Sequence, residues 1–185
     1  VRRLRPFLWA GMLALHIGLI ALVDFADLSL GMVILHLFTF DPVWVRPLRP
    51  EVTETLFYDG GCGLCHRFVR WALSEDRAGT AFRFAPLQGE TFEASVAAEA
   101  RAGLPDSLVV RNADGALLVQ SEAVLHFMRR LGGLWRVIAT IIGLVPVGIR
   151  ARVYEGVARV RHRLFAKPST ACPVLPPRLR SRFQA

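Results

Sequence analysis

Two cysteines separated by two residues are the part of this chain best suited to chemistry. Cys62-Gly63-Leu64-Cys65 follows a short apolar run and a glycine turn, and it precedes residues spaced as in an amphipathic helix. Two thiols at this spacing can close a small disulfide ring and open it again, and the positive end of a helix favours the thiolate of the first cysteine. We therefore predict redox chemistry, with Cys62 as the exposed attacking thiol and Cys65 as a more buried resolving thiol.

Two other uses of the same cysteine pair stay open. Zinc sites share this spacing but need two further ligands, and the sequence has no second CxxC and no histidine pair at finger spacing. His66 adjoins Cys65 but points elsewhere on the helix, and Cys172 stands alone in a tail, as either a third redox thiol or an incidental residue. The other alternative is a non-catalytic module that docks onto or regulates a membrane protein. We expect neither a cofactor nor a metal.

Asp59, just before the cysteines, has three possible roles. It exchanges a proton with Cys65, it disfavours the thiolates through its negative charge, or it accepts hydrogen bonds from the amides of the glycine turn. We count Asp59 with Cys62 and Cys65 as a predicted catalytic residue. Gly60 and Gly61 permit the tight loop that exposes the first cysteine.

The elements that must position these residues alternate between strand-like and helix-like patterns. Strands are predicted over 56–58, 82–86, 107–111 and 116–120, and helices over 65–75, 91–101 and 122–131, with the turn 112–115 between the last two strands and Ser121 as the cap of the last helix. This order predicts an α/β, thioredoxin-like fold, in which a mixed four-stranded sheet has flanking helices. Such enzymes place a cis-proline beside the cysteines; Pro105 lies near that position, with a trans turn proline as the alternative.

The N-terminal quarter predicts a membrane helical hairpin. Two stretches, 6–23 and 28–45, are largely apolar, and each approaches the length that crosses a bilayer. Arginines flank the outer ends and aspartates the middle, so the positive-inside rule places both ends, and the cysteine pair, in the cytoplasm. Within the hairpin we expect packing or interfacial roles for His16 and His36, with a functional role as the alternative.

The whole chain is expected to contain five segments. They are a membrane hairpin at 1–45, a linker at 46–53, a thioredoxin-like core at 54–131, C-terminal amphipathic helices at 132–167 and a basic, proline-rich extended tail at 168–185. Because the chain begins with Val, we expect the hairpin to be a fragment of a larger membrane domain. The apolar run at 134–149 is too short and too charged for a crossing, so it packs on the domain or lies in the membrane interface.

The charge of the chain favours contact with a membrane surface. The formal net charge is +8, from 23 basic and 15 acidic residues, and arginines are dense at 150–163 and 178–182. Beside an apolar hairpin, this pattern favours anionic lipid headgroups, and no basic motif interleaved with aromatics indicates nucleic acid. Three cysteines do not make a secreted disulfide framework, which favours a reducing compartment.

The segment around the cysteine pair resembles the DCC family of thiol-disulfide oxidoreductases. The stretch 58–65 is similar to the YDGxCxxC signature of that family, and further similarities are at Asp106-Ser107, Asp114-Gly115, Ser121-Glu122-Ala123, Ala151-Arg152-Val153-Tyr154 and Arg159–Arg163. The resemblance covers about residues 54–175 and implies a thioredoxin-like fold with Asp59, Cys62 and Cys65 as characteristic residues. The first 45 residues are similar to the last membrane helices of the HTTM domain, which is related to vitamin K-dependent gamma-carboxylases and can precede DCC domains in bacterial chains.

Together these patterns predict a membrane-tethered thiol-disulfide oxidoreductase of the protein-disulfide reductase type. Its expected partners are a protein or small-molecule disulfide substrate, an external thiol reductant that resets the pair, and membrane lipids, but no nucleic acid. No carboxylase activity follows for this chain, because the resemblance to the HTTM domain covers only its last helices.

Overall fold

The computed structural model describes residues 4–23, 26–41, 44–45, 50–165 and 177–184. The chain divides into two compact units, Val1–Arg46 and Pro47–Ala185. Each unit is considered by itself below. The predicted linker at 46–53 falls partly, and Cys172 wholly, outside the described residues.

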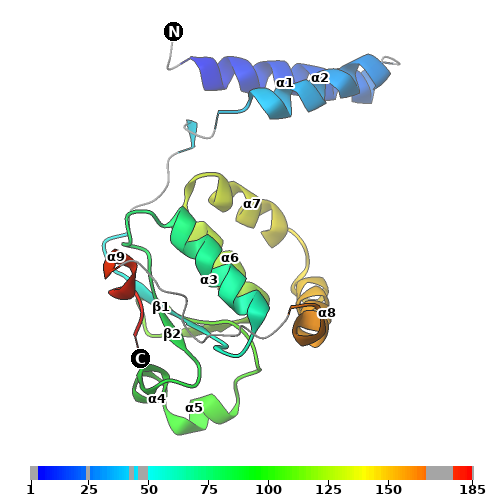
Figure 1. The fold of residues 1–185 in the computed structure, drawn as a ribbon. Coiled ribbons are helices and arrows are strands. Elements are labelled where there is room, and N and C mark those ends of the chain that lie inside the picture. The colour runs from blue at the N-terminus through cyan, green and yellow to red at the C-terminus, as the bar shows by residue number, and fades with distance from the viewer. Residues whose placement is uncertain (1–3, 24–25, 42–43, 46–49, 166–176, 185) are drawn as a thin grey trace. The chain divides into compact units, whose positions relative to one another are not determined.

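The first unit consists of two apolar helices packed side by side, α1 (Arg5–Leu22) and α2 (Ala26–Thr39) (Figure 1). The indole N–H of Trp9 donates to the carbonyl of His36 at 3.0 Å, and the rings of His16 and His36 lie 5.5 Å apart, which gives both histidines a packing contact. By length and composition α1 suffices to cross a membrane, whereas α2 is a shorter apolar helix. A hairpin of two full membrane spans therefore stays a prediction.

The second unit is built on a four-stranded mixed sheet. Its strands are β1 (Glu54–Tyr58), β2 (Phe82–Pro86), β3 (Val109–Arg111) and β4 (Leu117–Val119), in the order β2-β1-β3-β4. Strand β1 runs parallel to β2 and antiparallel to β3, and β3 is antiparallel to β4. The predicted α/β class and mixed four-stranded sheet are confirmed.

Alternate residues of β1 face two separate apolar clusters, as the pleat of a strand requires. Leu56 faces the larger cluster, which includes Phe127 and is covered by α3 (Gly63–Glu75) and α6 (Gln120–Leu131). Phe57 faces the smaller cluster, where α4 (Glu90–Ser95) contributes Phe92. The sheet therefore has helices on both faces (Figure 1).

Two local predictions on these helices were wrong. The single helix expected over 91–101 is two short ones, α4 and α5 (Ala98–Ala102), because Val96 takes an extended conformation and buries its side chain in the smaller cluster. Ser121 is not the cap of α6. The helix starts two residues earlier than predicted, at Gln120, after Val119 and without a side-chain cap, which places Ser121 inside the first turn.

The helices after the sheet form a bend. Helix α7 (Gly133–Gly143) and helix α8 (Val147–Leu164) meet at 112°, with Pro146 as the residue before α8. A proline just before a helix removes no hydrogen bond from it. The predicted basic helix at 151–163 is thus the larger part of α8, which packs against α3 and α6.

The C-terminal segment 177–184 folds back onto the sheet, so the prediction of an extended tail was wrong for these residues. After α9 (Pro177–Arg180), Phe183 forms a parallel β-bridge with Phe84 of β2. The guanidinium of Arg182 lies 2.6 Å from the carboxylate of Asp76 and also donates to the carbonyl of Phe82 at 3.1 Å. A buried ion pair fixes this segment, in which both terminal nitrogens of Arg182 have acceptors while its Nε has none among the described residues. The arginines and prolines of the segment alone did not indicate this pairing.

Candidate functional site

The cysteine pair lies where β1 ends and α3 begins. Cys62 is the N-cap of α3, and its sulfur accepts the backbone N–H of Cys65 at 3.4 Å. The backbone N–H of Cys62 donates to the carbonyl of Asp59 at 3.2 Å, which closes the loop ahead of the helix. A sulfur at a helix N-terminus, with an amide pointing at it, is in a position that stabilises negative charge.

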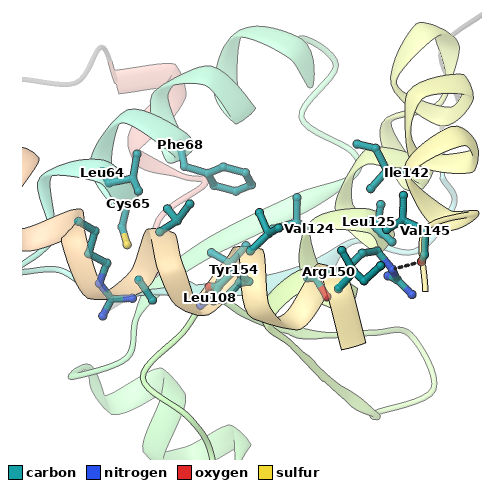
Figure 2. A pocket seen from close by; sticks show the side chains of 16 residues that line it. Leu64, Cys65, Phe68, Leu108, Val124, Leu125, Ile142, Val145, Arg150 and Tyr154 are labelled. Atoms are coloured by element: carbon teal, nitrogen blue, oxygen red, sulfur yellow. Dashed lines mark hydrogen bonds between the residues drawn. The ribbon is translucent and has the colours of Figure 1, made fainter. Parts of the chain in front are cut away.

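The burial of the two sulfurs is the reverse of the prediction. Both cysteines are free thiols, but Cys62 is fully buried and Cys65 is half-buried. The Cys62 side chain caps the first turn of α3, whereas Cys65 projects from α3 toward α8 (Figure 2). The predicted exposed attacking thiol is therefore covered in this structure.

The environment of Cys65 disfavours its thiolate. Burial, followed by the hydrogen bond and the charge of Cys62, raises the pKa of Cys65 to about 12, while the charge of Arg161 acts in the opposite direction. A thiol with this pKa stays protonated at neutral pH, which makes it a poor attacking group.

Arg161 is the residue of the site that the sequence analysis did not single out. Its buried guanidinium lies 2.5 Å from the carboxylate of Asp106 and 3.8 Å from that of Asp59. Burial alone would lower the pKa of Arg161, but Asp106 and the two cysteines together raise it. It is therefore a permanent positive charge beside both sulfurs. Its spacing of seven residues from Tyr154 places both on one face of α8, and the similarity of the stretches 151–154 and 159–163 to the DCC family was the available signal.

Asp59 holds the loop. Its carboxylate accepts the backbone N–H of Gly61 at 2.8 Å and the side-chain amide of Gln88 at 3.1 Å. The amide oxygen of Gln88 accepts the N–H of Gly60 at 3.2 Å in return. Of the three predicted roles, acceptance of hydrogen bonds from the turn is the one that these contacts display.

The segment before β3 carries the other residues near the pair. The described residues contain no cis peptide bond, so Pro105 takes the trans alternative. The hydroxyl of Tyr154 accepts the backbone N–H of Leu108 at 3.0 Å, which ties α8 to the start of β3. Burial raises the pKa of Tyr154, so its hydroxyl stays neutral.

An apolar cavity of about 460 Å³ opens beside Cys65 (Figure 2). It runs from the cysteine end of α3 along α6 and α8 to the end of α7 and the start of α8, where Arg150 lies. Most of its wall consists of branched and aromatic side chains; its lining is Leu64, Cys65, Phe68, Leu108, Ser121, Val124, Leu125, Ile142, Val145, Ile149, Arg150, Val153, Tyr154, Val157, Ala158 and Arg161.

Within the part of the chain that the structure describes, no group of three or more His, Cys, Asp or Glu side chains is arranged to hold a metal ion. A metal site on Cys62 and Cys65 would need further ligands from outside these residues.

Comparison with known proteins agrees with the site. Residues 56–167 match the family model for DCC1-like thiol-disulfide oxidoreductases. The chain belongs to this family. Among the curated proteins, the uncharacterized protein YuxK of Bacillus subtilis (strain 168) is 32% identical over 134 residues, which cover 70% of this chain and 93% of YuxK. A chloroplastic DCC family protein of Arabidopsis thaliana is 30% identical over 133 residues, which cover 70% of this chain and 76% of that protein.

No solved structure matches the chain. The DCC1-like match begins at residue 56, so the similarity of the first 45 residues to the HTTM domain stays a prediction.

Proposed function

We propose that the protein is a thiol-disulfide oxidoreductase in which Cys62 and Cys65 cycle between dithiol and disulfide. The observation that carries the proposal is the 3.4 Å contact between the Cys62 sulfur and the Cys65 amide at the start of α3, because it places two free thiols one turn apart. Family membership supports the reaction class. The strand order β2-β1-β3-β4, with one parallel and two antiparallel pairings, supports the thioredoxin-like assignment.

The proposed reaction moves two electrons from the pair to a substrate disulfide. The Cys62 thiolate attacks one substrate sulfur, the substrate S–S bond breaks, and the departing thiolate takes up a proton. The Cys65 thiol then loses its proton and attacks the Cys62 sulfur. The second substrate thiol leaves, and Cys62 and Cys65 form a disulfide.

The charges at the site support this division of roles. The amide of Cys65 and the positive end of α3 stabilise the Cys62 thiolate, and the raised pKa of Cys65 keeps that thiol protonated until the mixed disulfide has formed. We propose Arg161 as the cation that stabilises the transferred negative charge and Asp59 as the residue that holds both the loop and Arg161 in place.

The burial of Cys62 favours a second candidate function, a non-catalytic module whose cysteines do not exchange with substrate. A trapping experiment separates the two. Insulin-disulfide reduction should be lost in Cys62→Ser, and Cys65→Ser should accumulate a mixed disulfide on Cys62. If the wild-type pair forms no disulfide across accessible redox potentials, the module is the better description.

We also propose that the protein is tethered to a membrane with the cysteine pair in the cytoplasm. Support comes from α1 and from the described residues of the second unit, where every exposed large apolar side chain except Val52 lies between Leu134 and Leu164. Exposed apolar side chains interleaved with arginines are typical of interfacial helices. Because α7 and α8 are bent by 112°, the pair fits an interface better than a crossing.

Contact of the helix bend with the membrane can be tested by spin labels at two positions. A nitroxide at Leu144, which is 81% exposed at the bend, should be accessible to oxygen rather than to a polar nickel reagent in anionic vesicles. A nitroxide at Asp114, in the exposed turn between β3 and β4, should show the reverse. Equal accessibility at the two positions contradicts the interfacial role, and a topology reporter at residue 50 tests the cytoplasmic placement.

A further inference from the structure

The cavity beside the cysteine pair meets one sulfur and not the other. Cys65 is part of its wall, whereas Cys62 is fully buried and is absent from the lining. Figure 2 shows the Cys65 sulfur at one end of the cavity, with Tyr154 near the middle and Val145 and Arg150 at the far end. A molecule that fills the cavity therefore reaches the pair at Cys65.

The chemistry of the oxidised pair points to the same sulfur. When a thiolate attacks a disulfide, the exchange is faster if the sulfur that leaves is the more stable thiolate. Attack on Cys65 releases Cys62, whose charge is stabilised by the Cys65 amide and by Arg161. Attack on Cys62 would instead release Cys65, whose burial raises its pKa to about 12. Attack on Cys65 is therefore favoured for two reasons: its sulfur lines the cavity, and the sulfur that leaves is the more stable thiolate of Cys62.

We propose that this cavity binds the reductant that resets the pair, and that this reductant is an elongated, apolar, uncharged dithiol. This inference rests on the proposed redox function. The volume of about 460 Å³ lies within the range of small-molecule sites. Its branched and aromatic wall selects apolar chains. The guanidinium of Arg150 at the far end is paired with Glu122 at 2.6 Å and donates to the Val145 carbonyl at 3.0 Å, so that end favours a neutral group over a carboxylate.

The step balances in two exchanges. One thiolate of the ligand attacks the Cys65 sulfur, the Cys62–Cys65 bond breaks, and Cys62 leaves as a thiolate and takes up a proton. The second thiol of the ligand loses its proton, attacks the ligand's own sulfur in the mixed disulfide, and releases Cys65, which takes up a proton. The ligand is oxidised to a cyclic disulfide, and two electrons pass to the protein. The Cys62 thiolate could also attack the Cys65 sulfur in the mixed disulfide and re-form the protein disulfide. The second ligand thiol can compete with this reverse reaction because it is on the same molecule as the sulfur that it attacks.

The test uses dihydrolipoamide, a neutral apolar dithiol, against dithiothreitol, a small polar dithiol. The full chain with Cys172→Ser is reconstituted in nanodiscs, oxidised, and mixed with each reductant, and the reduced fraction is followed by rapid acid quench and thiol alkylation. We expect dihydrolipoamide to react roughly ten times faster at equal, subsaturating thiolate concentration, since burial of about two methylene groups provides that factor.

Two valine variants on α8 provide the matched control. Val157 lines the cavity, whereas Val160, one turn away and 41% exposed, does not. Val157→Trp should remove the advantage of dihydrolipoamide over dithiothreitol, and an unchanged far-UV circular dichroism spectrum and melting temperature show that the variant is folded. Val160→Trp should keep the advantage.

The outcomes separate this inference from the proposed function. Equal rates for the two dithiols in the wild-type chain, or the same loss in both tryptophan variants, overturn the cavity as the reductant site while leaving a working redox pair. If mild oxidation gives no disulfide that either dithiol can reduce, the proposed function itself fails and the cavity inference fails with it.

Discussion

Arg161 and Arg182 are two buried guanidinium groups that reach the α/β unit from its C-terminal part. They are 4% and 5% exposed, and each pairs with an aspartate distant in the sequence, Arg161 with Asp106 and Arg182 with Asp76. Their partners differ. The side chain of Asp76 is 5% exposed, whereas that of Asp106 is 73% exposed.

The difference in partners decides what each arginine contributes. Arg182 and Asp76 are both buried, and the Asp76 carboxylate also accepts the backbone N–H groups of Gly79 and Ala81. The charge of Arg182 therefore acts within the fold, on Asp76. Arg161 has a solvated partner and lies beside two sulfurs, so its charge also acts on them. Equal burial of two cations therefore does not imply equal roles.

The largest expected effect comes from breaking the fully buried pair. Arg182→Met should lower the free energy of unfolding by about 3–5 kcal/mol, because it leaves the Asp76 carboxylate buried without its partner. Arg152→Met, at an exposed position of α8, should cost no more than about 0.5 kcal/mol. Urea unfolding of the Pro47–Ala185 unit measures both. Equal losses of unfolding free energy in the two variants would show that the Arg182–Asp76 pair does not hold the C-terminal segment on the fold.

Arg161 should show the converse pattern, with a larger effect on chemistry than on stability. Arg161→Met should slow oxidation of the reduced pair by a small disulfide about tenfold at pH 7, since loss of a nearby opposite charge disfavours the thiolates. Its cost in unfolding free energy should stay at about 1–2 kcal/mol, because Asp106 is solvated. The largely buried Asp59 carboxylate also keeps its hydrogen bonds to Gly61 and Gln88. Stopped-flow kinetics and urea unfolding on the same samples make the comparison, with Arg161→Lys expected to recover part of the rate. A stability loss as large as that of Arg182→Met with an unchanged rate would remove Arg161 from the chemistry.

The same two arginines show which parts of the site can be predicted from the sequence. The strand-turn-CxxC-helix pattern is local, so the positions of β1, α3 and the cysteine pair followed from residues 54–75. Contacts that join residues 55 or 106 positions apart have no local pattern, so neither Arg161 nor Arg182 was singled out. The burial order of the cysteines depends on how the Cys62 side chain caps α3 and on where α8 lies, which spacing alone does not specify.

Asp59 connects the loop to Arg161, and two substitutions separate its hydrogen bonds from its charge. Asp59→Asn retains an oxygen for the Gly61 amide and should keep the oxidation rate within about twofold of wild type. Asp59→Ala removes that acceptor and should cost about 1 kcal/mol of stability and a few-fold in rate. The same unfolding and stopped-flow measurements apply. If Asp59→Asn slows oxidation of the cysteine pair as much as Asp59→Ala does, the hydrogen bond to the loop does not explain the effect. The charge of Asp59 then takes part in proton exchange.

The remaining prediction concerns the pH dependence of stability. Burial raises the pKa of Cys65 in the folded protein to about 12, from an ordinary value of 9.0. Below pH 9 both states bind the proton and the contribution of Cys65 is fully present; between pH 9 and 12 the unfolded chain releases the proton first, so stability falls as pH rises.

The slope attributable to Cys65 should be below about 1.4 kcal/mol per pH unit, the limit for one proton. Urea unfolding of the reduced unit at several pH values should show it, and Cys65→Ala should remove it. Arg161→Met should extend the decline to higher pH, because Arg161 opposes the rise in the pKa of Cys65, whereas Arg182→Met should leave this part of the slope unchanged. If both arginine variants shift the slope alike, the electrostatic distinction between the two buried cations is wrong, and Arg161 acts on Cys65 only through the fold.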